Sequence, residues 1–327
     1  MYFLSPQIQL LVLLSSVLQL VQCTSSGNDG FRNGFKRWHK TTDDNVFNFT
    51  DYANQLYYGP MYYQGGSIMN YGVRIYTVFY GDFTSTAIAH FGNFIKGVGT
   101  SDWWKTTLKY YDSQGNHPST HVEWAGSLHM KYTSGKTIYN APALLSMAMQ
   151  SQGWPTNNTF TDIFALVLSN DVNEIQVGGN GSSICNSYCG YHKSDDGFNY
   201  IVVGTGEYGC HIDGWNGCIP GPLRHTADES FSVNGDRLTD ALIDSFAHEL
   251  TETVTNAYGA WYDANGNENG DKCATFYDGC KTLKKDGPPF NVDLGSMGKF
   301  LIQSNWDPVA QKCVLTPAPV YDIKWRK

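Results

Sequence analysis

The sequence has few charged residues, and those it has leave the chain acidic. Asp, Glu, Lys and Arg together make up 16% of the 327 residues, below the roughly 25% of an average globular protein, and the net charge is −8. Nucleic acids and anionic membranes attract cationic faces, so neither is expected as a partner. Aromatic residues reach 14%, which is typical of a chain that folds around a core and not of a disordered one.

The sequence also lacks an N-terminal apolar run long enough to span a membrane. The run Ile8–Val21 is interrupted by polar residues, whereas a spanning helix needs about 20 apolar residues. Its length and position predict a secretory signal peptide over residues 1–23, although no Lys or Arg precedes the run. Residues 24–64 are polar and rich in Gly, Asn and Asp, which predicts a flexible arm or a propeptide. Residues 317–327 are predicted to form a C-terminal tail.

The cysteines lack the paired Cys-x-x-Cys spacing of a zinc site, and their number favours disulfide bonds in an oxidising compartment. Removal of the signal peptide leaves an odd number, which predicts three disulfides and one further thiol. Close spacing suggests the pairs Cys185–Cys189 and Cys210–Cys218, with Cys273 or Cys280 joined to Cys313. Glycosylation sequons, which also fit a secreted protein, begin at Asn48, Asn157 and Asn180.

Strand and helix patterns intermix along the chain without internal repeats and without a strict β-α-β alternation. Strands are predicted at residues 71–83, 121–132, 162–168, 200–203 and 300–303, and helices at 84–98, 103–111, 138–150 and 236–256. The pattern predicts one domain over residues 65–316 in the mixed α/β class, α+β-like, with a central mixed sheet flanked by helices. The pair Trp103-Trp104 is interpreted as core, not as a carbohydrate platform.

The helix predicted at 236–256 contains the pentapeptide His248-Glu249-Leu250-Thr251-Glu252, within a stretch that has no positive charge. Leu242, Phe246, Leu250 and Val254 form an apolar stripe, and His248 and Glu252 project together from another face. Between Leu238 and Asp271 the chain has no Lys or Arg. Its acidic residues there are Asp240, Asp244, Glu249, Glu252, Asp263, Glu268 and Asp271. A bound cation would neutralise such a cluster.

The spacing of this pentapeptide is similar to that of the His-Glu-x-x-His zinc peptidases, in which two ligands four residues apart hold the metal and the Glu acts as general base. We therefore predict a zincin-like metal-binding helix with His248 and Glu252 as ligands and Glu249 as base. Glu268 or Asp271 would supply the third ligand, and Asp244 would orient His248. His192, His211 and His225, which are predicted in loops, are alternative third ligands. A site with two carboxylates and one imidazole predicts slower hydrolysis or a harder metal than a His-rich site.

Other chemistries find less support in the sequence. Oxygen-bearing residues alternate from Asp263 to Asp271, which leaves an irregular calcium turn as an alternative to zinc. An EF-hand is excluded because Glu268 stands where that loop needs Gly, and Ala274 stands where it needs an acid. No Gly-x-Ser-x-Gly elbow is present, so Ser245 is not expected to be a nucleophile.

Several short motifs occur in order between residues 65 and 315. They are Gly65-Gly66-Ser67-Ile68-Met69, Phe79-Tyr80-Gly81-Asp82, Trp103-Trp104-Lys105-Thr106, Val167–Val172, Cys189-Gly190-Tyr191-His192, Asn234-Gly235-Asp236, Ala247–Glu252, Ala260-Trp261-Tyr262, Glu268–Cys273 and Asn305-Trp306-Asp307-Pro308. In this combination the chain resembles the phosphate-induced/EXORDIUM-like family of secreted plant proteins.

This resemblance implies an extracellular or cell-wall location and a link to growth and carbon status. Relatives carry a similar His-Glu-x-x-Glu element, but the family is not described as a peptidase family. The chain departs from the family at Ala257, where relatives place Pro, so the helix is predicted to run one turn further. Cys280 has no family counterpart and is predicted to be the unpaired thiol.

Two functions are consistent with these observations. The first is a secreted zinc-dependent hydrolase that acts on peptide bonds. The second is a non-catalytic extracellular protein that takes part in binding or signalling during growth. Its partner would be a component of the cell wall or extracellular matrix, with aromatic side chains in contact with carbohydrate.

Overall fold

The structure is a computed structural model that describes residues 59–156, 159–176, 182–184, 187–195, 197–206, 218–223, 228 and 230–317. The predicted signal peptide, nearly all of the predicted arm and the predicted tail beyond residue 317 lie outside these ranges. So do the three sequon asparagines Asn48, Asn157 and Asn180, the cysteines Cys185 and Cys210, and the histidines His211 and His225.

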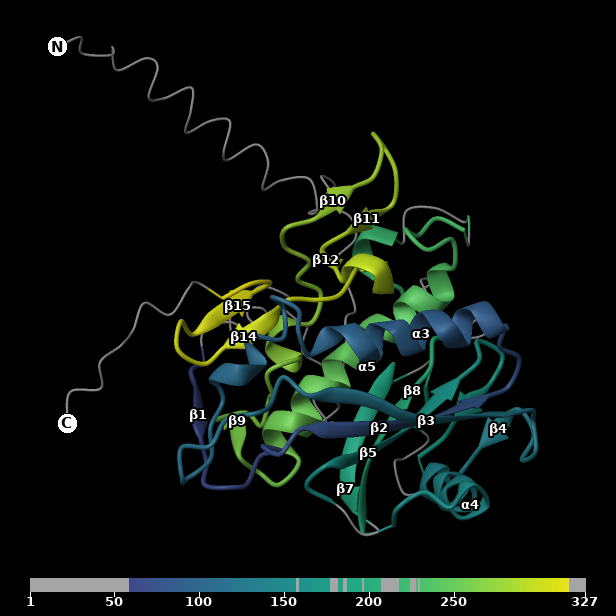
Figure 1. The fold of residues 1–327 in the computed structure, drawn as a ribbon, viewed down its shortest axis with the longest axis horizontal. Coiled ribbons are helices and arrows are strands. Elements are labelled where there is room, and N and C mark those ends of the chain that lie inside the picture. The colour runs from purple at the N-terminus through teal and green to yellow at the C-terminus, as the bar shows by residue number, and fades with distance from the viewer. Residues whose placement is uncertain are drawn as a thin grey trace, which may run out of the picture.

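A five-stranded sheet forms the centre of the molecule (Figure 1). Its strands, in spatial order, are β3 (Val122–Met130), β2 (Val73–Tyr80), β5 (Asp162–Leu168), β8 (Phe198–Val203) and β7 (Gly190–Asp195). The first four are parallel to one another, and the edge strand β7 runs antiparallel to β8. Every residue of β5 is buried, as expected for a continuous apolar strand that is covered on both faces.

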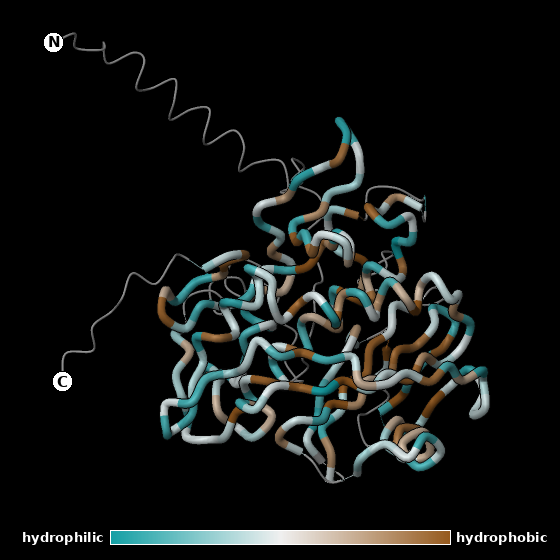
Figure 2. Tube along the Cα trace, viewed as in Figure 1, coloured by the Kyte–Doolittle hydropathy of each residue, from teal (hydrophilic) through white to brown (hydrophobic). Residues whose placement is uncertain are grey.

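Helices cover both faces of this sheet (Figure 1). Helices α3 (Ser85–Val98) and α5 (Arg237–Asn256) pack on one face, where their apolar side chains share a core with Ile75, Ala165 and Val203. Helix α4 (Ala141–Gln152) packs on the other face against a second apolar cluster. Figure 2 shows apolar residues concentrated in the strands of this sheet. The predicted mixed α/β fold, with a central mixed sheet flanked by helices, is therefore confirmed.

The rest of the described chain forms short two-stranded pairs and 3₁₀ turns. The pairs are β1 (Met61–Tyr63) with β9 (Trp261–Asp263), β4 (Thr137–Ile138) with β6 (Asn173–Glu174), β10 (Lys281–Thr282) with β11 (Pro289–Phe290), β12 (Val292–Asp293) with β13 (Lys299–Phe300), and β14 (Asn305–Asp307) with β15 (Lys312–Val314). The 3₁₀ turns are η1 (Thr107–Lys109), η2 (Gly221–Leu223), η3 (Asp271–Cys273) and η4 (Gly295–Met297). Among the described residues, no helix is long and apolar enough to cross a membrane.

Two predicted elements form differently in the structure. Residues 103–111 make turns and the single 3₁₀ turn η1, not a helix. The tryptophan side chains favour this conformation over a helix, because the indole N–H groups of Trp103 and Trp104 donate to the backbone carbonyls of Gln303 and Ser119. Both tryptophans are buried, which confirms their interpretation as core. The strand predicted at 300–303 ends at Phe300, and the backbone N–H of Gln303 bonds to the Asp244 carboxylate instead of to a neighbouring strand.

The disulfide pattern differs from the one that spacing suggested. Cys189 bonds to Cys218, so the predicted pairs Cys185–Cys189 and Cys210–Cys218 are both wrong. Cys189, which directly precedes β7, lies beside Cys218 in the fold. Its disulfide partner is therefore set by the fold and not by closeness along the chain. Of the two partners predicted for Cys313, the structure shows Cys273 and not Cys280. Cys280 is also disulfide-bonded, so the prediction that it is the unpaired thiol is wrong.

Helix α5 is buried around almost its whole circumference, from Thr239 to Thr255. Its apolar stripe packs on the sheet, while Asp244 and His248 contact Gln303 in the C-terminal part of the chain. The helix ends at Asn256, one residue before Ala257, so the predicted extension by one turn is wrong. The side chain of Asn256 accepts the backbone N–H of Trp261, which turns the chain away from the helix axis.

The N-terminus of α5 has a side-chain cap whose contribution to stability can be measured. Asp236 caps it by accepting the backbone N–H of Thr239 at 3.0 Å and the hydroxyl of Thr239 at 2.6 Å. We expect Asp236→Ala to lower the free energy of unfolding by about 1 kcal/mol, because an orphan N–H loses its partner. Urea denaturation measures this loss, and Asp236→Asn, which keeps an acceptor, should recover most of it. Equal losses in both variants would contradict the capping role.

Candidate metal centre

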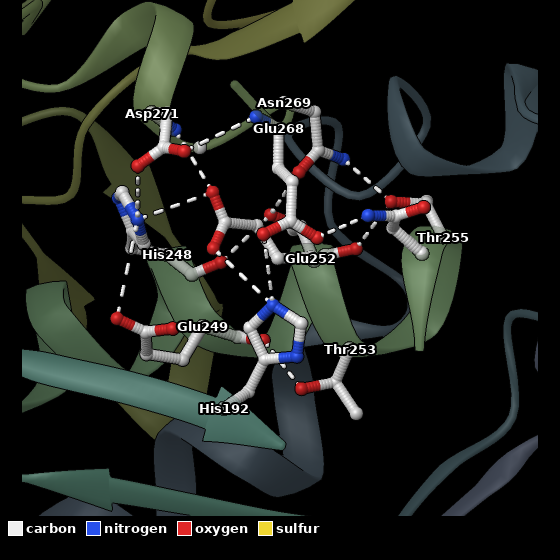
Figure 3. Close-up of polar contacts among 12 residues, drawn as sticks. His192, His248, Glu249, Glu252, Thr253, Thr255, Glu268, Asn269 and Asp271 are labelled. Carbon is white, nitrogen blue, oxygen red and sulfur yellow. Dashed lines mark hydrogen bonds and ion pairs between the residues drawn. The ribbon is translucent and has the colours of Figure 1, made fainter. Parts of the chain in front are cut away.

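Six titratable side chains from three parts of the chain converge in one cluster, which is buried or half-buried (Figure 3). Helix α5 provides His248, Glu249 and Glu252, and the edge strand β7 provides His192. The segment that follows β9 folds back over the helix and provides Glu268 and Asp271. These six residues form the His–carboxylate cluster.

His248 lies at one end of the cluster. Its Nε2 is 3.2 Å from Glu252 Oε1, 3.7 Å from Asp271 Oδ1 and 4.0 Å from Glu249 Oε1. The side chains of His248, Glu249 and Glu252 are each only 3–4% exposed. The distances between the His248, Glu252 and Asp271 donor atoms fit a shared ion, since ligands about 2 Å from zinc lie roughly 3–4 Å from one another.

His192 lies at the other end of the cluster. Its Nε2 is 3.2 Å from Glu268 Oε2 and 3.6 Å from Glu252 Oε2. The structure therefore places Glu268 beside His192, whereas Asp271 lies beside His248. Glu252 connects the two ends, because each of its carboxylate oxygens faces a different imidazole.

Gln303 fixes the orientation of His248. The Nδ1 of His248 is 3.1 Å from Gln303 Oε1, which leaves Nε2 directed at the carboxylates when Nδ1 carries the proton. The amide nitrogen of the same Gln303 side chain donates to the carbonyl of Gly270 at 2.8 Å. Asp244 accepts the backbone N–H of Gln303 at 2.7 Å and the hydroxyl of Tyr277 at 2.7 Å. Asp244 thus acts on His248 through Gln303.

A buried lysine anchors the segment that carries Glu268 and Asp271. The side chains of Lys272 and Asp263 are both fully buried, and Lys272 Nζ is 3.1 Å from Asp263 Oδ2. Asp263 Oδ1 also accepts the backbone N–H groups of Asn265 and Asn267, each at 2.9 Å. The carboxylate on which the alternative calcium turn would depend is therefore engaged by Lys272 and by its own loop. The calcium alternative itself stays a prediction.

Burial and crowding shift the pKa values of the cluster. Burial raises the pKa of the Glu249 and Glu252 carboxyls, and the neighbouring His248 offsets this rise only in part. Burial alone would lower the pKa of His192, but the charge of Glu268, followed by those of Glu252 and Glu249, raises it to about 9. Protons therefore neutralise part of the cluster in the metal-free protein. A metal ion has to displace these protons, so its affinity should increase with pH.

Two glycines make room for the cluster. A Cβ atom at Gly270 would lie 2.9 Å from Glu252 Oε1, and one at Gly190 would lie 3.0 Å from Glu249 Oε1. A cavity of about 370 Å³ opens between β7 and the segment after α5, with His192, Ser194, Asn256, Tyr262 and Glu268 among its lining residues. The His192 end of the cluster thus lies beside a cavity.

The comparisons with known proteins agree with the motifs found in the sequence. The profile of the family described as "Phosphate-induced protein 1 conserved region" matches residues 61–316. The chain belongs to the phosphate-induced protein 1 family. Within this family, it is 25% identical to Protein EXORDIUM-like 5 of Arabidopsis thaliana over 77% of this chain and 76% of that protein. It is 23% identical to Protein PHOSPHATE-INDUCED 1 of Nicotiana tabacum over 80% of this chain and 88% of that protein. No solved structure matches the chain significantly.

The structure brings together most of the residues that the sequence had singled out within this phosphate-induced protein 1 chain. His248, Glu249, Glu252, Glu268 and Asp271 all lie in the cluster. His192 had been predicted in a loop and only as an alternative ligand, but it lies in the edge strand β7. Gln303 was missed, because a glutamine at the end of a short apolar run carries no motif that points to a metal site.

Proposed function

We propose that this protein is a secreted, zinc-dependent hydrolase that acts on peptide bonds. One observation carries the proposal: two imidazoles and four carboxylates converge, with side chains that are 3–19% exposed, and ion-pair distances of 3.2–4.0 Å connect them. Perturbed titratable groups that gather beside a cavity are typical of functional sites.

The donor set at His248 fits a divalent metal. His248 Nε2, Glu252 Oε1 and Asp271 Oδ1 would hold the ion, and Gln303 would keep the imidazole in the required orientation. A zinc ion held there would act as a Lewis acid on a substrate carbonyl and would lower the pKa of a nearby water molecule. Glu252 also accepts the backbone N–H of Asp271 at 2.9 Å, which holds two of the proposed ligands together.

Glu249 is the proposed general base. It follows His248 directly on α5 and lies beside the three donor atoms without being one of them. Burial raises the pKa of its carboxyl, and an acid whose pKa is raised toward neutrality is better matched to proton transfer at neutral pH. It would accept a proton from the attacking water and pass it to the leaving amine.

The edge strand β7 supports a peptide substrate. It pairs with β8 on one side, and it is the last strand of the described sheet on the other. The cavity lies along this strand, with Ser194 and His192 among its lining residues. A sheet edge binds extended peptides by adding them as a further strand, so a peptide bound along β7 would pass the His192 end of the cluster.

The decisive experiment compares wild-type protein with the Glu249→Gln variant. We expect the variant to keep the metal at the His248 site and to lose peptide hydrolysis by roughly 10²–10⁴-fold, because the base is removed while the ligands stay. Metal content is measured by inductively coupled plasma mass spectrometry, and hydrolysis is measured on a peptide library. A variant that keeps all of its activity would exclude the peptidase function.

Secretion is part of the proposal. It is supported by the two described disulfide bonds, which persist in oxidising compartments, and by the predicted signal peptide. Removal of residues 1–23 during export to the extracellular space or cell wall is expected. N-terminal sequencing of the exported protein checks this.

One observation favours a second function. Closed metal sites are structural, and His248, Glu249 and Glu252 are almost fully buried. In that case the ion would stabilise a non-catalytic protein that binds a cell-wall component. Metal removal would then lower the melting temperature, and Glu249→Gln would affect no hydrolysis because none would be measurable.

A further inference from the structure

Glu252 is placed as a bridging ligand. Its Oε1 lies 3.2 Å from the Nε2 of His248, and its Oε2 lies 3.6 Å from the Nε2 of His192. A carboxylate that serves one metal ion needs only one of these imidazoles. Because each carboxylate oxygen of Glu252 faces a different imidazole, the arrangement fits two bound ions better than one.

The His192 side repeats the composition of the His248 side. His248 and Glu252 are accompanied by Asp271, whereas His192 and Glu252 are accompanied by Glu268, whose Oε2 is 3.2 Å from His192 Nε2. The amide of Asn256 donates to Glu268 Oε1 and so turns Oε2 toward the imidazole. Each half of the cluster thus has one imidazole, one carboxylate of its own and a share of Glu252.

An independent observation at Glu249 also points to a missing ligand. Glu249 is 3% exposed, and none of the described residues donates a hydrogen bond to its carboxylate. Its donor atom lies within 4.8 Å of those of His192 and Glu252. Buried carboxylates are almost always satisfied by donors or ions. The structure therefore calls for a cation, or for water held by one, beside Glu249.

The charge of the cluster indicates how many cations it requires. Glu249, Glu252, Glu268 and Asp271 contribute four negative charges when ionised, and neutral imidazoles contribute none. One divalent ion would leave two negative charges uncompensated in a buried site, which is costly. Two divalent ions would neutralise the four carboxylates.

We propose that the cluster binds two divalent cations that share Glu252. His248, Glu252 and Asp271 hold the first ion, and His192, Glu252 and Glu268 hold the second, with Glu249 facing the pair. This inference rests on the proposed metal-dependent function and extends it to a two-metal site, in which the ions lie about 3.5–4 Å apart. The second ion is the one beside the cavity.

Titration of the metal-free mature protein with Zn²⁺ alone tests the proposal. We expect two equivalents to bind to the wild type and one to bind to His192→Ala. The matched control is His121→Ala, which removes a histidine that is 67% exposed and lies outside the cluster, and it should bind two. A wild type that binds one equivalent, unchanged in His192→Ala, would overturn the second site but not the proposed function. A wild type that binds none would overturn both.

Two further measurements separate a shared pair from two independent ions. In wild-type protein loaded with Co²⁺, the electron paramagnetic resonance signal of the first equivalent should decrease as the second binds, because ions bridged by one carboxylate couple magnetically. Additive signals would contradict the bridge, and this test needs no variant that might fail to fold. Glu268→Gln should weaken the second ion at least 10-fold, whereas Glu249→Gln should retain both ions. If Glu249→Gln loses the second ion and Glu268→Gln keeps it, Glu249 and not Glu268 is the ligand of that ion.

Discussion

Glu252→Gln is expected to remove both metal ions and to reduce peptide hydrolysis to the level of the uncatalysed reaction. Glu252 is the carboxylate that lies closest to both imidazoles taken together, at 3.2 Å from His248 and 3.6 Å from His192. Replacement of one carboxylate oxygen by an amide removes the negative charge and one of the two donor atoms. Both halves of the cluster then retain only an imidazole and one carboxylate, too few donors for a tight zinc site.

The matched control for this variant is Glu174→Gln. Glu174 is 2% exposed, close to the 3% of Glu252, but it lies on β6 and accepts hydrogen bonds from Tyr188 and Tyr191, not from the cluster. The control should keep its metal and its activity. Metal analysis after gel filtration, together with circular dichroism, measures the effect. A Glu252→Gln protein that is folded and still holds two equivalents would contradict both the bridge and the first site.

Asp263→Ala should have the largest effect on stability, about 3–5 kcal/mol, because it removes the partner of a buried charge. Lys272 is fully buried, and its ammonium group contacts Asp263, the carbonyl of Gly59 and the face of Trp306. Loss of the carboxylate removes the nearest counter-ion of this buried charge, which costs far more than the intact pair contributes. The pKa of Lys272 is already lowered by burial, although Asp263 opposes this.

Chemical denaturation measures this loss, and two comparisons test its cause. The double variant Asp263→Ala/Lys272→Met should regain much of the stability, because no unpaired charge remains in the core. Asp293→Ala, which breaks an exposed ion pair with Lys299, should cost at most about 1 kcal/mol. If Asp263→Ala destabilises no more than Asp293→Ala, the buried ion pair is not what anchors this segment.

The sequence could predict those parts of the site whose residues lie close together along the chain. His248 and Glu252 are four residues apart on one helix, so helical geometry alone places them together. Glu268 and Asp271 could also be predicted as site residues, because a Gly- and Asn-rich segment can fold back over the preceding helix. His192 reaches the cluster only because β7 runs antiparallel to β8 at the edge of the sheet, and this pairing leaves no mark in the sequence near His192.

The same division applies to the fold. The buried strand at 162–168 and the helix at 236–256 are long, strongly patterned segments, and they form as expected. The Cys189–Cys218 bond and the turns after Trp103 depend on contacts with residues that lie 15, 29 and 200 positions away. Such contacts are decided by tertiary packing, which outweighs local preference.

The bond between Cys273 and Cys313 has a consequence for when the proposed metal site can form. It fixes the end of η3, two residues after Asp271, to β15. In a reducing environment this tether would be missing, and the carboxylate of Asp271 would be held less firmly beside His248. Metal loading should therefore follow oxidation, and in the proposed secreted enzyme the site would stay empty until the chain had left the cytosol. An enzyme that cleaves peptide bonds would in this way be kept from the proteins of the cell that produces it.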